Sequence, residues 1–299
     1  MPSELFCNSA ARVMSSQKPQ PSRTRLPYLL LRRYLVAMTA DKRLTLVRVK
    51  IERARKHLLE VGAEIRLFLQ GKPYVIGTKR DPQTRRLIYY LVSVRDTPLG
   101  LAAMVGDVLQ NLRSALDHLA YQLVLVGTAG VPPTRRVYFP IADDATKYKA
   151  EKPGRVKGMR QDAIDAMDAL KPYKGGNDPL WRLHRLSIID KHRLLITVGS
   201  AFSSVNVAPL LERDFPGVAG KVTLPPLWLK PADRLFPLKQ GDELFADLPD
   251  TEVVDKVGFA FDLAFGEPQV VEGEPLLRTL QGMADLVDKI VCSFRPLLA

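Results

Sequence analysis

Four polar side chains recur at steps of four, three and four residues within residues 106–122: Asp107, Asn111, Ser114 and His118. At about 100° per residue, this spacing places them in one stripe along an α-helix. The stripe combines a carboxylate, an amide, a hydroxyl and an imidazole, which are groups that perform acid–base chemistry near neutral pH. The same groups also form solvated faces and hydrogen-bonded networks between helices, so the chemistry of this stripe stays open at this point.

A second carboxylate, Asp190, lies on the apolar face of another expected helix. That face is otherwise made of leucines: Leu183, Leu186 and Leu194. A buried carboxylate needs a partner, because an unpaired charge in an apolar environment is costly. If the two helices pack together, Arg113 and His118 are the basic side chains that we expect to pair with it. The alternative role of such a pair is structural, fixing the register of the two helices.

A metal site would draw on two carboxylates and two imidazoles: Asp107, His118, Asp190 and His192. Such mixed ligands suit divalent metals, but Asp190 and His192 point about 160° apart on a helix. The sequence also has no HExxH pattern, no Gly-rich phosphate loop, no nucleophile elbow and no Cys–His arrangement. We therefore expect neither a metal nor a cofactor.

The stretch from Arg113 to His118, RSALDH, matches the pattern R-x4-H. It resembles the catalytic signature of the HEPN superfamily, mainly helical proteins of which many are metal-independent ribonucleases that act as dimers. The resemblance implies that Arg113 stabilises charge on the scissile phosphate and that His118 acts as general acid or base. We also expect a supporting polar network made of Asp107, Asn111, Ser114, Asp117, Asp190 and His192.

Two features depart from this family. Ser114 stands directly after the arginine, where HEPN enzymes often have Asn or Asp, and the second half of the chain is rich in expected strands. In addition, residues five apart on a regular helix point about 140° from each other. Arg113 and His118 converge only through side-chain reach, a local helix distortion or apposition across a dimer.

A longer pattern runs through the chain: Gly106-Asp107, then NLRSALDH at residues 111–118, FPI at 139–141 and DKHR at 190–193. It is similar to a pattern found in bacterial proteins of uncharacterised function, in which GDxxxNLRSALDH is followed by FPI and DKHR. This second resemblance covers most of the chain after Met38 and implies no activity.

Long amphipathic helices are expected to position these residues. Apolar side chains recur every three or four residues in residues 42–70, 105–123, 161–170, 180–195 and 275–294. Thr39, Thr97 and Asp178 are expected to cap three of these helices.

Strands are expected between and after these helices. Residues 74–78 and 87–94 predict a β-hairpin around the turn at 81–84. Residues 127–158 are predicted to form a loop. Four further strands are expected at 194–198, 204–208, 221–230 and 257–265. The combination predicts an α+β protein, a helical bundle packed with a mainly antiparallel sheet.

The chain has 299 residues and a net charge of +12, most of it in residues 1–60, where 13 Lys and Arg face four acidic residues. Two cysteines without metal spacing favour a reducing compartment, so we expect a cytoplasmic protein. No apolar run approaches the ~20 residues that span a membrane. Residues 1–37 are expected to be disordered or untranslated, with Met38 as an alternative start, and residues 38–299 to form a single domain.

The sequence leaves two functions open. The more specific hypothesis is a HEPN-like, metal-independent ribonuclease of a defence or toxin system, with Arg113 and His118 as catalytic residues. Its partners would be RNA and a second copy of the chain. The alternative is a non-catalytic binding or interaction module, in which the same residues form a buried polar network.

Overall fold

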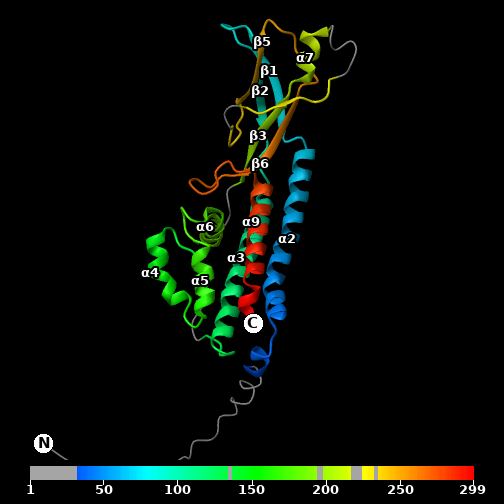
Figure 1. Ribbon diagram of the computed structural model, residues 1–299. Helices are drawn as coiled ribbons and strands as arrows, with labels where there is room; N and C mark the ends of the chain where they lie inside the picture. Colours follow the sequence, from blue (N-terminus) through cyan, green and yellow to red (C-terminus); the bar gives the residue numbers. More distant parts are fainter. Residues whose placement is uncertain (1–31, 134–136, 194–197, 217–223, 232–234) are drawn as a thin grey trace, which may run out of the picture.

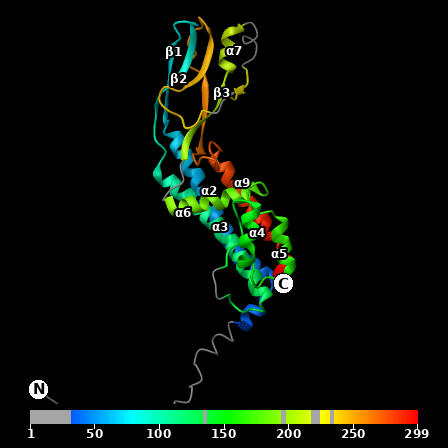
Figure 2. The same cartoon turned by 90° about the vertical axis from the view of Figure 1, so that its left-hand side faces the viewer.

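Three long helices run side by side and form the body of the protein (Figures 1 and 2). They are α2 (Ala40–Gln70), α3 (Leu99–Gly127) and α9 (Leu276–Ser293). The structure, a computed structural model, describes residues 32–133, 137–193, 198–216, 224–231 and 235–299. At 1.5 Å per residue, the 31 residues of α2 extend roughly 46 Å, which gives the molecule its elongated shape.

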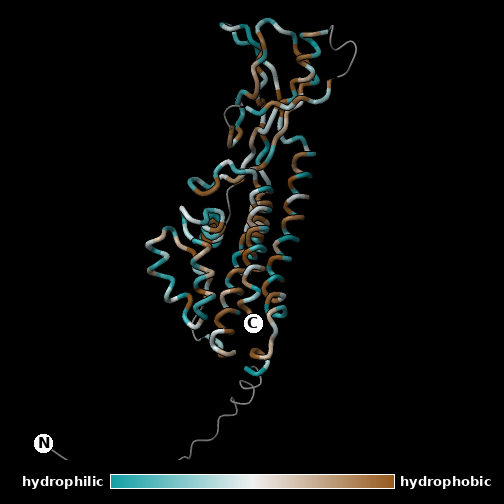
Figure 3. The backbone as a smooth tube through the Cα atoms, viewed as in Figure 1, coloured by the Kyte–Doolittle hydropathy of each residue, from teal (hydrophilic) through white to brown (hydrophobic). Residues whose placement is uncertain are grey.

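The apolar seams predicted for these helices are confirmed. In α2, residues from Val47 to Phe68 alternate between core and surface, and in α3 every predicted core position from Val105 to Leu123 is buried. The tube coloured by hydropathy shows the same alternation along the helices (Figure 3). At the start of α9, Leu277 is exposed and Leu276 is buried.

Three shorter helices cover one side of the bundle (Figures 1 and 2). They are α4 (Ala145–Arg155), α5 (Gln161–Ala169) and α6 (Asp178–Arg193), and α6 packs against α3. Helix α4 lies in the stretch predicted as a loop. The prediction was wrong because the helix has almost no apolar face, with Tyr148 as its buried residue, and because it contains Pro153.

Two antiparallel three-stranded sheets form a head at one end of the bundle (Figure 1). One has the order β1 (Tyr74–Arg80), β2 (Arg86–Val94) and β5 (Glu243–Pro249). The other has the order β4 (Trp228–Leu229), β3 (Val198–Asn206) and β6 (Gly258–Phe265). The helix α7 (Ala208–Asp214) follows β3, and η1 (Arg295–Leu298) follows α9.

The head has its own apolar core, built around Leu91, Phe202 and Leu244. Strand β6 connects the two cores, since Leu263 and Phe265 belong to the bundle core while Phe259 and Phe261 pack against the head core. The α+β fold class is thereby confirmed, with two antiparallel sheets where one was expected.

Of the three predicted helix caps, one is confirmed and two are wrong. The hydroxyl of Thr39 accepts from Lys42 N (3.3 Å), which confirms the cap of α2. The hydroxyl of Thr97 instead donates to Val198 O (3.0 Å), so it ties the start of α3 to β3 and caps nothing. At α6 the capping oxygen is Asn177 Oδ1, which accepts from Leu180 N (3.2 Å), whereas the predicted cap Asp178 accepts from Gly175 N.

The strand predictions were confirmed for the hairpin and for β6, whereas β5 and the helix α7 were not foreseen. Of the strand expected at residues 194–198, positions 194–197 lie outside the described residues, as do 221–223 of the strand expected at 221–230. Residues 1–31 of the expected N-terminal extension lie outside them too. Among the residues that are described, no helix is long and apolar enough to cross a membrane.

Gly127 allows the end of α3 to approach the backbone before α5. A Cβ at this position would lie 2.1 Å from Gly158 O and 3.0 Å from Arg160 N. We expect Gly127→Ala to lower the free energy of unfolding by about 1–3 kcal/mol, because the backbone must shift to admit the methyl group. Gly282→Ala in α9, where a Cβ meets nothing within 4 Å, should raise it by up to about 1 kcal/mol. Urea unfolding of both variants checks this, and equal stabilisation by both would contradict the close approach.

Candidate functional site

The predicted polar stripe lies along an accessible flank of α3. Asp107 and His118 are exposed, and Asn111 and Ser114 are half-buried. The amide of Asn111 donates to the carbonyl oxygen of Asp107 (2.8 Å), one turn earlier in the same helix. This part of the stripe therefore bonds to its own helix, and its side chains do not converge on a common point.

His118 faces α2 across the helix pair. Burial and the nearby ammonium of Lys50 lower the pKa of His118, while Asp117 opposes them. The imidazole is consequently neutral at pH 7 and remains accessible to solvent.

Asp190 has a different partner from the one expected. Its carboxylate accepts from Gln110 Nε2 (3.1 Å), and the same amide donates to Ser187 O (2.7 Å). The expected pairing with Arg113 or His118 was therefore wrong. The reason is the position of Gly106, where a Cβ would lie 2.2 Å from Asp190 Oδ1, so the carboxylate packs directly on the backbone of α3 before it reaches either basic residue.

His192 lies exposed near the end of α6, away from Asp190 as the helical spacing predicts. Within the described ranges, no group of three or more His, Cys, Asp and Glu side chains is placed to hold a metal ion. The four residues of the metal alternative are thus not brought together.

Arg113 and Asp117 form an ion pair that holds the backbone of the loop before α4. Arg113 Nη2 lies 3.0 Å from Asp117 Oδ1 and donates to Phe139 O (2.8 Å), while Asp117 Oδ1 accepts from Phe139 N (2.9 Å). Both backbone groups of Phe139 are bonded in this way, and the phenyl ring is fully buried in the bundle core. Residues four apart lie on one helix face, which is why this pair can act together.

The two predicted catalytic residues therefore point to different sides of α3. Arg113 lies under the loop at 139–141, whereas His118 lies toward Lys50 on α2. Within one chain they do not share a site, and their catalytic assignment remains a prediction that depends on apposition across a dimer.

A cavity of about 60 Å³ lies beside the ion pair, between α3, α4, α6 and the backbone of residues 139–142. Its polar lining consists of Arg113, Tyr148, Glu151, Lys152, Arg155 and His184. Two buried nitrogens among them, Arg113 Nη1 and His184 Nδ1, have no hydrogen-bond partner in the described part of the chain. Buried polar atoms are otherwise nearly always bonded, so these two are chemically unusual, as is Arg43 Nε elsewhere among the described residues.

Burial and the surrounding charges keep His184 neutral. Burial, and then the positive charge of Arg113, lower the pKa of His184 to about 3, although Asp143 opposes this shift. Burial also lowers the pKa of Arg113 itself, yet a guanidinium keeps its proton throughout the physiological range. The cavity therefore combines a fixed positive charge with an imidazole that cannot readily add another.

Other cations of the lining are held by neighbouring groups. Lys152 Nζ lies 2.6 Å from Asp168 Oδ2, and Asp168 also accepts from the hydroxyl of Tyr148 (2.9 Å). Burial, and then the hydrogen bond to Asp168, raise the pKa of the Tyr148 hydroxyl above its usual range. Arg155 lies over the ring of Tyr138, 5.3 Å from its centroid. Helix α4 thus presents two positioned cations to the cavity.

The sequence reasoning missed His184, Lys152 and Arg155. Lys152 and Arg155 lie on α4, which was not expected to be a helix. The available signal was Asp117 rather than His118, since the spacing from Arg113 to Asp117 is that of an i,i+4 ion pair.

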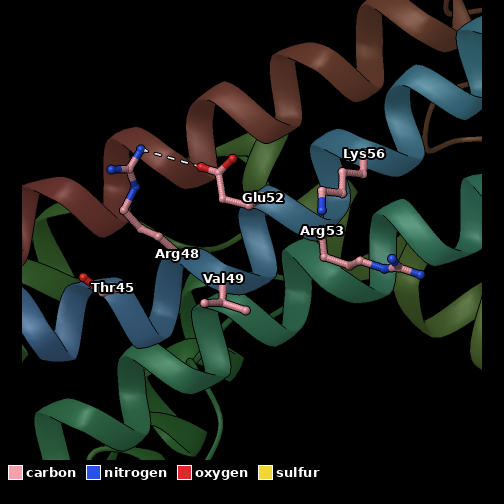
Figure 4. A pocket seen from close by; sticks show the side chains of 6 residues that line it. All are labelled: Thr45, Arg48, Val49, Glu52, Arg53 and Lys56. Atoms are coloured by element: carbon pink, nitrogen blue, oxygen red, sulfur yellow. Dashed lines mark ion pairs between the residues drawn. The ribbon is translucent and has the colours of Figure 1, made fainter.

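A second depression lies on the outer face of α2 (Figure 4). Its lining residues come from successive turns of that helix: Thr45, Arg48, Val49, Glu52, Arg53 and Lys56. Arg48 is paired with Glu52 (3.9 Å) and with Asp288 of α9 (3.1 Å). It is an open and shallow surface, in contrast to the cavity beside Arg113.

Comparisons with known proteins add no relative. No protein-family model matches the chain, and neither curated proteins nor solved structures gave a significant match. The two resemblances described from the sequence therefore remain predictions.

Removing Asp117 tests the role of the ion pair. In Asp117→Ala, the guanidinium of Arg113 and the N–H of Phe139 lose their acceptor, and we expect a loss of about 3 kcal/mol in the free energy of unfolding at pH 7. The matched control is Asp107→Ala, an exposed carboxylate of the same helix, which should change stability by less than about 0.5 kcal/mol. Similar values for the two variants in urea unfolding would show that the pair does not hold the loop.

His184 should make stability depend on pH. The pKa of His184 is about 3 in the folded protein against about 6.5 in an unfolded chain, so below pH 6.5 the unfolded chain takes up a proton that the folded protein does not. The free energy of unfolding of the wild type relative to His184→Gln should be constant above pH 7. It should fall by about 1.4 kcal/mol per unit from pH 6 toward pH 4. A difference that stays constant over this range would contradict the buried neutral imidazole.

Proposed function

We propose that the protein is a non-catalytic binding protein, in which the polar groups of α3 maintain the structure and border a ligand site. The observation that carries this proposal is the use of Arg113. Its Nη2 bonds both Asp117 and Phe139 O, and Asp117 bonds Phe139 N, so this nitrogen and the carboxylate hold the backbone of one loop while Nη1 stays unbonded.

A catalytic arginine must direct its donors at the group on which charge develops in the transition state. In this protein the general acid or base would have to be His118, which lies on the other flank of α3 beside Lys50. A phosphate bonded by Arg113 within one chain would therefore be out of reach of this imidazole. A binding role requires no such convergence.

The cavity beside Arg113 supports a binding role more directly. It is lined by side chains of three helices and by the backbone of residues 139–142, and two of its buried nitrogens have no partner in the described chain. Polar groups that converge on a hollow are typical of ligand sites.

A second candidate function is the HEPN-like ribonuclease. One observation favours it: His118 is exposed, and Lys50 places a positive charge next to it. Arg53 and Lys56 on the following turns of α2 are exposed as well, and such basic surfaces attract phosphate backbones. In this candidate, Arg113 of one chain and His118 of a second copy form the site.

An RNA cleavage assay separates the two candidates. Purified protein, with its oligomeric state measured by light scattering, is incubated with labelled RNA in the presence of a chelator. We expect the RNA to remain intact with the wild type, because no acid–base pair is assembled. Cleavage by the wild type that disappears in His118→Ala and in Arg113→Lys, with both variants folded by circular dichroism, would overturn the proposal and support the ribonuclease.

A further inference from the structure

The cavity beside Arg113 offers hydrogen-bond donors that the protein does not use. Arg113 Nη1 is buried and lacks a partner in the described residues, although Nη2 of the same guanidinium makes two contacts. The side chain of Arg113 is only 11% exposed, so solvent does not readily replace the missing partner. Leaving a charged donor unbonded costs more than leaving a neutral one, which favours an occupant that accepts from it.

The charge of the lining selects the kind of occupant. Three cations, Arg113, Lys152 and Arg155, line the cavity against one carboxylate, Glu151, and His184 is neutral. Each of these cations has an acidic partner: Asp117 for Arg113 (3.0 Å), Asp168 for Lys152 (2.6 Å) and Glu151 for Arg155 (3.7 Å). Those carboxylates hold the cations in place, and Arg113 Nη1 keeps donors that none of them accepts from.

The size of the cavity and the geometry of its donors further limit the kind of ligand that it can hold. A cavity of about 60 Å³ holds a group equivalent to a few water molecules and is too small for a nucleobase or a sugar. Guanidinium groups bond the oxygens of phosphate and similar oxyanions with parallel N–H donors. A neutral imidazole adds one further donor through whichever ring nitrogen carries the proton.

We propose that the cavity formed by Arg113, Lys152, Arg155 and His184 binds a tetrahedral oxyanion of the phosphate class, either free or as the terminal group of a phosphomonoester. This inference rests on the proposed binding function and names its ligand class. Arg113 Nη1 and His184 Nδ1 donate to the oxyanion from the side of α3 and α6, and Lys152 and Arg155 approach it from α4.

Inorganic phosphate is the first probe. It is titrated at pH 7 into the full chain, with sodium chloride matched for ionic strength, and binding is followed by calorimetry and by the melting temperature. We expect saturable binding at one site and a rise in melting temperature, because a ligand that binds the folded state stabilises it. Phosphate effects no larger than those of sodium chloride would overturn the proposal.

A pair of charge-removing variants locates the site. Arg155→Gln removes a partly exposed cation of the lining and should weaken phosphate binding by roughly tenfold or more, with the circular dichroism spectrum unchanged. Arg66→Gln removes the same charge from an exposed position of α2 and should leave the affinity unchanged. Equal weakening by both variants would assign the effect to net charge and overturn the site.

The protonation of His184 gives a second readout. Burial lowers the pKa of His184 to about 3, and among the charged groups around the imidazole Asp143 opposes this shift. Arg113, Arg155 and Arg185 add to it. A bound oxyanion offsets their charge, so phosphate should raise the pKa of His184 in an NMR titration, with the resonance assigned by its loss in His184→Gln. A pKa that is the same with and without saturating phosphate contradicts an oxyanion at this position.

Comparing inorganic phosphate with phenyl phosphate distinguishes the two sources. Tighter binding of phenyl phosphate indicates the terminal group of a larger ligand, and exclusive binding of inorganic phosphate indicates a free oxyanion. RNA cleavage that depends on His118 would overturn the proposed function but leave these results standing. Absence of phosphate binding with intact RNA would overturn the ligand class alone.

Discussion

A guanidinium that is buried in a helical protein stays charged, so its position must supply both a counter-ion and acceptors for its N–H groups. For Arg113 the counter-ion is one helical turn away, at Asp117, and an acceptor is the carbonyl of Phe139. Because Asp117 also accepts from the N–H of Phe139, one ion pair bonds both backbone groups of this residue. The loop would otherwise bury them without partners. The placement of that loop, the burial of the Phe139 ring and the shape of the adjoining cavity all depend on this arrangement.

The same arrangement explains why two motifs distant in the sequence belong together. The helical motif provides Arg113 and Asp117, and the short motif at 139–141 provides the backbone that they hold. The third motif contributes Asp190, which packs on Gly106 and bonds Gln110. These residues of the three motifs therefore have structural roles. The pattern R-x4-H overlaps the i,i+4 ion pair of Arg113 and Asp117, and a spacing of four residues places two side chains on one helix face, whereas a spacing of five does not.

Much of the fold could be predicted from the sequence, because helical burial follows a period that apolar residues reveal directly. The seams of α2 and α3 were confirmed for this reason, as were the hairpin and β6. Helix α4 was not predicted because it is polar on nearly all sides and contains Pro153. The only feature of the sequence that indicated a helix there was the cap residue, Asp144. The site was harder still, since Lys152, Arg155 and His184 meet only through the packing of α4 and α6 around α3, which no local spacing encodes.

Carboxylates hold the cations that line the cavity. Asp117 pairs with Arg113 and Asp168 pairs with Lys152, so these cations need little rearrangement to bind an anion. Preorganised donors of this kind are more effective than mobile surface lysines, because the cost of ordering them is met during folding. Burial is the first cause of the neutral state of His184, and the arginines that attract an anion add to it by helping to exclude a proton from the ring. An anion in the cavity would relieve that exclusion, so anion binding and protonation of His184 must favour each other by thermodynamic linkage.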